Sequence, residues 1–389
     1  MAAIDWNLIS IIVFYSIIAV YFYTKRKSVE TQFNVIFLYK TKKFNVVMEK
    51  IANCCPRFWK WFGYASIPVG FTGMIFIVSY LAYALVKLFL VPSAAPSVSL
   101  VVPGVHIAGF TANLPFWYGI IALFFVIVVH EGAHGIVLAA HKLRIKSSGV
   151  GMALFLPLAF VEPDEKQLEK QKVTTQLSVF AAGAFSNFVN AGIVFLIAML
   201  LAPVAASVIT PSGAYFETIT ADKPAALAGI QSGDVIIGAD NVKILQASDL
   251  EKYMLAVTPG QTITLKTAEK EYTVNTIQNP NNASRAYIGI EFKQDIAVRP
   301  DLKAKFGNLP FGLYYLLRLF YWIFALNIGI GIINLLPLGP IDGGRMAKAA
   351  LHAKVQKKNA MKLFTILTYV SLFLLLANII MPYFVKAFA

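Results

Sequence analysis

Residues 116–140 read FWYGIIALFFVIVVHEGAHGIVLAA, an apolar run that contains one group of ionisable side chains. In a helix, His130 and His134 are four residues apart, so both imidazoles project from one face and can bind a single metal ion. Glu131 lies beside that face, where the general base of a metal-dependent hydrolase belongs. Ionisable side chains are costly inside a membrane span, which favours this role over two buried histidines satisfied by neighbouring groups. The sequence therefore predicts a zinc hydrolase whose active site lies within the membrane.

The chain has 389 residues, of which 58% are hydrophobic and 14% are charged. This composition predicts a membrane protein with an additional soluble part. The two cysteines, Cys54 and Cys55, are adjacent, which excludes a disulfide framework and a cysteine metal site. The net charge of +14 comes from basic residues that cluster beside apolar runs, as orientation signals at a membrane do. The lipid bilayer is therefore an expected partner and nucleic acid is not.

We predict an α-helical, multi-pass membrane protein with about six transmembrane helices. They are expected at Leu8–Tyr23, Phe62–Leu90, Phe116–Ala140, Val173–Ala202, Leu309–Leu338 and Met361–Phe388. Basic residues favour the cytoplasmic side, so Lys142–Lys146 and Lys25–Lys60 are predicted inside, the latter as an amphipathic stretch on the membrane surface. The loop Val91–Pro115 has no Lys, Arg, Asp or Glu and is predicted outside. The first, third and fifth spans then run inward.

From Pro203 to about Asn308, apolar and polar residues alternate and charges are plentiful, which predicts a soluble, strand-rich domain. The chain is therefore expected to have three parts. Residues 1–202 form a membrane domain with the first four spans, 203–308 an extracytoplasmic soluble domain, and 309–389 a membrane domain with the last two spans. Ser148–Val161 is apolar but too short to cross as a helix, so we expect a re-entrant or interfacial segment.

A catalytic zinc ion usually has three protein ligands and one open position, so a third ligand is needed besides the two histidines. Residues 334–345 read NLLPLGPIDGGR at the end of the fifth span. Pro337 and Pro340 interrupt the helix, and Asp342 is expected in the middle of that break. His134 and Asp342 both lie late in spans that run inward. Both are therefore expected in the cytoplasmic part of the bilayer, as one shared metal ion requires.

Together, the H-E-x-x-H motif and the later N-x-x-P…D-G motif resemble those of the site-2 proteases, the intramembrane zinc metalloproteases of regulated intramembrane proteolysis. The segment Lys223–Ile237 is similar to the helix, turn and strand of a PDZ domain, and Ala159–Glu165 is similar to archaeal members of the family. The resemblance extends from about Gly104 to Asp342, and its paired motifs are highly specific.

The resemblance implies one zinc ion per chain, with His130, His134 and Asp342 as its ligands. It implies Glu131 as the catalytic glutamate and Asn334 as a residue that assists transition-state stabilisation. The implied partners are transmembrane protein substrates, cleaved within or near their transmembrane helices.

Two further segments have open roles. Gly183–Asn187 is similar to the family's weaker G-x-x-x-N motif, but Ala184 stands where Pro is often found, so Asn187 is named only as support. Ser148–Val161 is either a structural re-entrant loop or a strand that pairs with an unwound substrate.

Two other function classes fit parts of the sequence. A metal transporter would also place histidine and aspartate in its spans, but it has no need of Glu131 next to a histidine. A catalytically inactive PDZ scaffold would usually have lost a metal ligand or the glutamate, and here all four residues are present.

Overall fold

The computed structural model describes residues 6–26, 29–32, 36–91, 98, 101–105, 114–153, 156–280 and 282–388. The chain folds as two compact units, and each is described by itself. The first comprises Met1–Ala198 with Arg318–Ala389, and the second comprises Met199–Leu317. Much of the predicted loop Val91–Pro115 lies outside the described residues.

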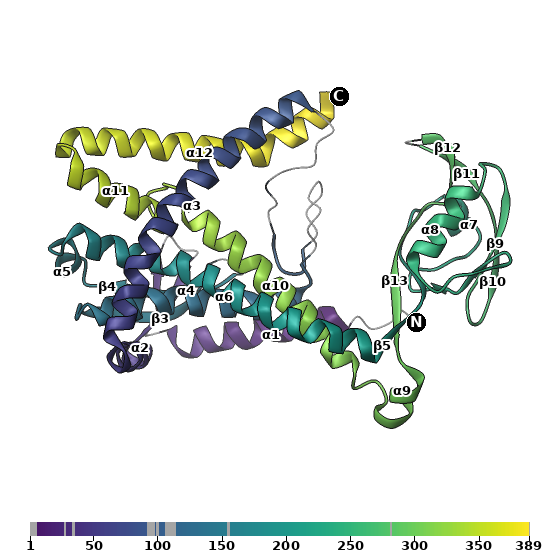
Figure 1. Ribbon diagram of the computed structural model, residues 1–389, viewed down its shortest axis with the longest axis horizontal. Helices are drawn as coiled ribbons and strands as arrows, with labels where there is room; N and C mark the ends of the chain where they lie inside the picture. Colours follow the sequence, from purple (N-terminus) through teal and green to yellow (C-terminus); the bar gives the residue numbers. More distant parts are fainter. Residues whose placement is uncertain are drawn as a thin grey trace. The chain divides into compact units, whose positions relative to one another are not determined.

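Helices dominate the first unit (Figure 1). In chain order, the helices that lie wholly or mostly in this unit are α1 (Trp6–Thr24), α2 (Lys43–Cys54), α3 (Pro56–Leu90), α4 (Phe116–Ala140), α5 (Glu165–Glu169), α6 (Val173–Val208), α10 (Phe311–Asn334), α11 (Asp342–Lys354) and α12 (Lys357–Phe388). Among the described residues, five helices are long and apolar enough to cross a membrane, namely α3, α4, α6, α10 and α12. This confirms a multi-pass membrane architecture. The first helix is apolar over the shorter length Leu8–Thr24, so the sixth span stays a prediction.

Several helices extend beyond the predicted spans. Helix α3 begins at Pro56 rather than Phe62, and proline is favourable in the first turn because its missing N–H has no partner there in any case. Helix α6 continues through Pro203 to Val208. An apolar run indicates which part of a helix can lie in the hydrocarbon core of a membrane. The helix itself can be longer, because its backbone hydrogen bonds continue past the apolar run.

A four-stranded antiparallel sheet accompanies these helices, with strand order β1-β2-β3-β4. The strands are β1 (Val29–Gln32), β2 (Ile36–Thr41), β3 (Ile145–Ala153) and β4 (Leu156–Pro163). Of the segment Ser148–Val161, the described residues 148–153 and 156–161 thus lie in two antiparallel paired strands, with Ser148 opposite Val161. Strand β4 is at the edge of the sheet, so its outer side has no strand partner within the described part of the chain.

Within Lys25–Lys60, strands β1 and β2 precede the amphipathic helix α2. The position of this stretch on the membrane surface stays a prediction. Strand β2 pairs with β3, which follows only after helices α3 and α4, so its partner was not visible in the local pattern. Helix α2 keeps the expected amphipathic character and buries Asn45, Met48 and Ala52. Asn45 Nδ2 donates a hydrogen bond to the carbonyl of Ile145 at 3.1 Å, which ties α2 to the sheet.

The turn between α10 and α11 fixes the position of Asp342. Helix α10 ends at Asn334, and Asp342 is the first residue of α11 rather than the middle of a break. A carboxylate is favourable at this position because the helix dipole is positive at its N-terminus. A Cβ on Gly343 would lie 2.2 Å from the carbonyl oxygen of Leu335, and Gly344 is similarly crowded by the turn. The double glycine therefore lets the turn lie directly on the start of α11.

The last two helices complete the first unit. Helices α11 and α12 form a hairpin, and α12 lies beside α3 (Figure 1). Asn378 Nδ2 in α12 donates a hydrogen bond to the carbonyl of Leu81 in α3 at 2.9 Å. Residues of α3, α6 and α11 share one buried cluster with the turn before α11, which includes Met74, Ala181, Leu335 and Met346. This cluster supports the element that carries Asp342.

The second unit is rich in strands. Its first sheet has the order β13-β5-β6, its second β10-β9-β7-β8 and its third β11-β12. The strands are β5 (Ile209–Ile219), β6 (Val235–Ile236), β7 (Gly238–Ala239), β8 (Val242–Lys243), β9 (Thr262–Lys266), β10 (Glu271–Asn275), β11 (Ile277–Asn279), β12 (Asn282–Tyr287) and β13 (Ile290–Val298). The helices are α7 (Pro224–Leu227), α8 (Ala247–Ala256) and α9 (Pro300–Phe306). Phe216, Ile236, Leu250 and Ile263 are among the residues of its buried core.

Candidate metal centre

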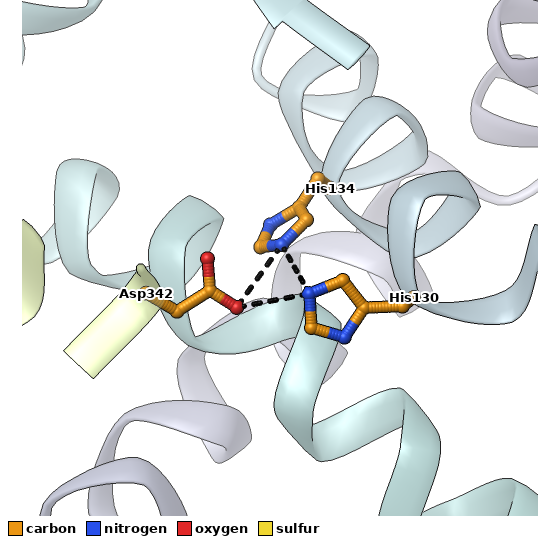
Figure 2. Close-up of side chains that lie close together, drawn as sticks. All are labelled: His130, His134 and Asp342. Carbon is orange, nitrogen blue, oxygen red and sulfur yellow. Dashed lines mark hydrogen bonds and ion pairs between the residues drawn. The ribbon is translucent and has the colours of Figure 1, made fainter. Parts of the chain in front are cut away.

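Helix α4 presents His130 and His134 from one face, with their Nε2 atoms 3.3 Å apart. Figure 2 shows Asp342 pointing at the same place from the start of α11. Its Oδ2 lies 3.1 Å from His130 Nε2 and 3.2 Å from His134 Nε2. The three side chains that the sequence suggested as metal ligands therefore meet at one point, although two segments far apart in the chain supply them.

The spacing and chemistry of these atoms fit a zinc ion. Ligand atoms about 2.0–2.1 Å from a tetrahedral zinc ion lie about 3.3 Å from one another, close to the distances found here. His134 Nδ1 is 2.7 Å from the carbonyl oxygen of Val179, so Nδ1–H donates and Nε2 keeps its lone pair. Asp342 Oδ2 is buried and has no hydrogen-bond donor among the described residues. A buried carboxylate oxygen that faces the lone pairs of two histidine nitrogens is unfavourable unless a cation lies between them. A zinc ion would be such a cation.

Asn187 on α6 supports the other histidine. Its side-chain amide lies 3.1 Å from His130 Nδ1, with Nδ2 nearest, while Oδ1 is buried without a partner among the described residues. At this contact the amide orientation and the imidazole tautomer are linked: with the amide turned over, His130 Nδ1–H donates to Oδ1. His130 Nε2 is left as a lone pair for a metal ion, as an outer hydrogen bond typically ensures in histidine metal sites.

Gly183, one helical turn before Asn187, lies directly against both histidines. A Cβ at this position would be 2.2 Å from His134 Nε2 and 2.7 Å from His130 Nε2. Helix α6 therefore needs a glycine where it passes the site. The sequence analysis named only Asn187, as support, and did not identify the contact of Gly183 with the histidines. The signal that could have found it is the four-residue spacing, which places both residues on one helix face.

Glu131 is half-buried beside the three candidate ligands and is not one of them. Its Oε2 accepts a hydrogen bond of 3.0 Å from the backbone N–H of Val161 in β4. The next residue, Glu162, accepts hydrogen bonds from Lys146 Nζ at 2.5 Å and Ser147 Oγ at 2.6 Å, which hold the pKa of its carboxyl below the usual range. These bonds tie the end of β4 to β3 and so fix the strand that contacts Glu131.

Asn334 is the last residue of α10 and is half-buried, eight positions before Asp342 in the chain. Its assignment as a donor to the reacting carbonyl stays a prediction.

The chain is similar to several known proteins. The model of peptidase family M50 matches residues 118–378, which contain all of the candidate ligands. An uncharacterised protein of Methanocaldococcus jannaschii is 27% identical over 353 residues, covering 88% of this chain and 86% of that protein. A Mesorhizobium japonicum protein named "putative zinc metalloprotease" is 24% identical over 243 residues, covering 48% of this chain and 64% of its own length. The solved PDZ domain of an SdrC-like protein from Listeria monocytogenes is similar at 22% identity and a TM-score of 0.19, covering 21% of this chain and 90% of that domain.

Proposed function

Because the chain belongs to peptidase family M50, the zinc-dependent site-2 protease family, we propose that it is an intramembrane zinc metalloprotease. It hydrolyses peptide bonds within or near the transmembrane helices of other membrane proteins, as in regulated intramembrane proteolysis. The observation that carries the proposal is the convergence of metal-binding atoms from His130, His134 and Asp342 between apolar helices.

These three side chains hold one zinc ion per chain in the proposed enzyme. When bound, the ion supplies Lewis-acid chemistry, which polarises the scissile carbonyl and lowers the pKa of water. Three protein ligands leave one tetrahedral position open, which is typical of catalytic rather than structural zinc sites.

Glu131 is the general base, which takes a proton from the attacking water and delivers it to the leaving nitrogen. Its place beside the ligands supports this role, and in the structure its carboxylate accepts a hydrogen bond of 3.0 Å from the N–H of Val161. Asn334 donates a hydrogen bond to the developing oxyanion, an effect of about 3–4 kcal/mol where such donors have been removed from other enzymes.

The substrate's helix has to unwind locally, because helical hydrogen bonds and side chains shield its peptide bonds. An unwound segment can add to the outer edge of β4 as a strand, a common mode of peptide recognition. Two observations support this edge as the place where the substrate binds. Strand β4 has no strand partner on that side within the described residues, and the N–H of Val161 points at Glu131. A strand bound there passes next to the proposed base.

In our proposal the metal centre is near the cytoplasmic side of a cell membrane, because basic clusters such as Lys142–Lys146 follow the inward-running spans. The domain at 203–308 is then extracytoplasmic. We expect it to be PDZ-like and to filter substrates, either by binding an extended peptide or by excluding large ectodomains.

Fragment analysis tests the proposed function. Membrane-protein fragments are compared by mass spectrometry between cells that express the wild type and cells that express Glu131→Gln. We expect fragments that end inside transmembrane segments to accumulate only with the wild type. A purified Glu131→Gln protein that cleaves such a substrate at the wild-type rate would refute the mechanism.

A further inference from the structure

An apolar cavity of about 590 Å³ borders Glu131 on the side of α4 that faces the sheet. Helices α2, α3, α4 and α6 and strands β3 and β4 line it, and it is partly open to the surface. Its wall includes Phe44, Met48, Phe62, Phe124, Val161 and Ile193. Ligand sites in proteins usually have volumes of about 300–1,000 Å³, so the cavity has room for at least one large side chain.

The polar side chains in the wall are mostly engaged elsewhere. Ser148 Oγ donates to Asn45 Oδ1 at 2.6 Å, and Ser186 Oγ donates to the carbonyl of Gly183 at 2.7 Å. Glu131 is the charged group in the wall, and it is the proposed base. An occupant of this cavity is therefore apolar and lies next to the reacting groups.

Gly132 leaves the cavity open on the side of α4. A Cβ built on Gly132 would have no heavy atom of the described chain within 4 Å, and the residue lines the cavity. Gly135 on the same helix differs, because its Cβ would lie 2.1 Å from Met48 Sδ, so close packing requires that glycine. Glycine inside a helix is less favourable than alanine by about 1 kcal/mol. At Gly132, close packing does not explain this loss of helix stability. A side chain at this position would instead fill the open space beside the base.

We propose that this cavity receives a bulky apolar side chain of the substrate, from one of the two residues that flank the cleaved bond, and that Gly132 sets the size it accepts. The inference rests on the proposed protease function. Three successive residues of β4, Ala159, Phe160 and Val161, also line the cavity. Successive side chains of a strand point to opposite faces. A substrate strand on the edge of β4 therefore directs every second side chain to the cavity side, and the one next to Glu131 enters it. A lipid acyl chain is the competing occupant.

The test uses purified full-length enzyme and a membrane-spanning peptide that the wild type cleaves. The two residues flanking the cleaved bond are changed in turn to Ala, Leu or Phe, and kcat/KM is measured for each version. We expect the wild type to prefer Leu or Phe at one of the two positions. Gly132→Leu should lower kcat/KM for the preferred bulky version by about tenfold or more, the range that one methylene produces in an apolar pocket. The Ala version should lose less, so that the ratio of bulky to Ala cleavage falls in Gly132→Leu.

Gly329→Leu in α10 is the matched control, because its added side chain also starts in open space and Gly329 does not line the cavity. It should leave the ratio of bulky to Ala cleavage unchanged. Phe124→Ala enlarges the cavity from another wall and should raise cleavage of a Trp version relative to the Phe version. If Gly132→Leu does not fold, Phe124→Ala alone tests whether the cavity receives the substrate side chain.

Unchanged ratios in Gly132→Leu and Phe124→Ala, or an equal loss for all versions, would overturn the inference and favour lipid as the occupant. The proposed protease would still stand in that case, because the wild type cleaves. Failure of the zinc-loaded wild type to cleave any membrane-spanning peptide would instead refute the protease itself.

Discussion

Replacing Gly183 with alanine places a methyl group against both histidines of the metal centre. The added Cβ would lie 2.2 Å from His134 Nε2 and 2.7 Å from His130 Nε2. Nonbonded heavy atoms are at their closest favourable distance at about 3.5 Å, so the rings or the helix must move by about 1 Å. The atoms that must move are two of the three proposed zinc ligands. We therefore expect zinc affinity to fall by about 10–100-fold, as when the outer support of a metal site is lost.

The same substitution should leave the protein folded. Overpacking typically costs about 1–3 kcal/mol, and alanine in a helix is favoured over glycine by about 1 kcal/mol. The net loss of unfolding free energy is then about 0–2 kcal/mol. Gly192→Ala in the same helix is the control, because its Cβ would have nothing within 4 Å among the described residues. It should raise stability slightly and leave zinc affinity unchanged.

The assay is a zinc titration against a competing chelator on purified proteins, together with thermal unfolding of the zinc-free forms. We expect Gly183→Ala to bind zinc more weakly than the wild type and Gly192→Ala to bind it equally. A Gly183→Ala protein with wild-type zinc affinity would refute the argument that α6 needs a glycine to make room for the ligands.

Four further predictions follow from the same structure. His134→Ala should lower zinc content, whereas Glu131→Gln should retain it, as measured by metal analysis; loss of zinc in both would make Glu131 a ligand. Asn187→Ala should weaken zinc binding by about 10–100-fold, and an unchanged affinity would show that the amide does not orient His130. Protease added to right-side-out vesicles should digest the domain at 203–308, and its protection would reverse the proposed topology. Replacing Ser212–Asp295 by a flexible linker should preserve cleavage of a short transmembrane substrate and relax discrimination against bulky ectodomains; a folded, zinc-loaded deletion that is inactive would rule out a filter.

The part of the site that depends on local spacing was predictable from the sequence. Four-residue spacing in a helix places His130 and His134 on one face whatever surrounds them. The N-x-x-P…D-G motif pointed to Asp342, and the structure brings this residue to both histidines. Its exact place at the start of α11 was not foreseen, because prolines indicate where one helix ends and not where the next begins.

The parts that depend on distant partners were not predictable. Strands β1 and β2 form because β3 offers β2 an edge to pair with, although helices α2, α3 and α4 separate the two strands in the chain. The approach of Gly183 to the histidines depends on how α6 packs against α4, which a single sequence does not specify. The hydrogen bond from Val161 to Glu131 likewise joins two segments whose meeting is a property of the fold.

That hydrogen bond has a consequence for the timing of catalysis. The N–H of Val161 is at once the donor to Glu131 and a group that an added substrate strand on β4 would seek for pairing. One N–H cannot serve two acceptors at full strength. A strand that pairs at Val161 therefore takes this donor from the glutamate and leaves the carboxylate freer to accept a proton from water. In the proposed enzyme, Glu131 would therefore be held by Val161 until a substrate strand binds and releases it.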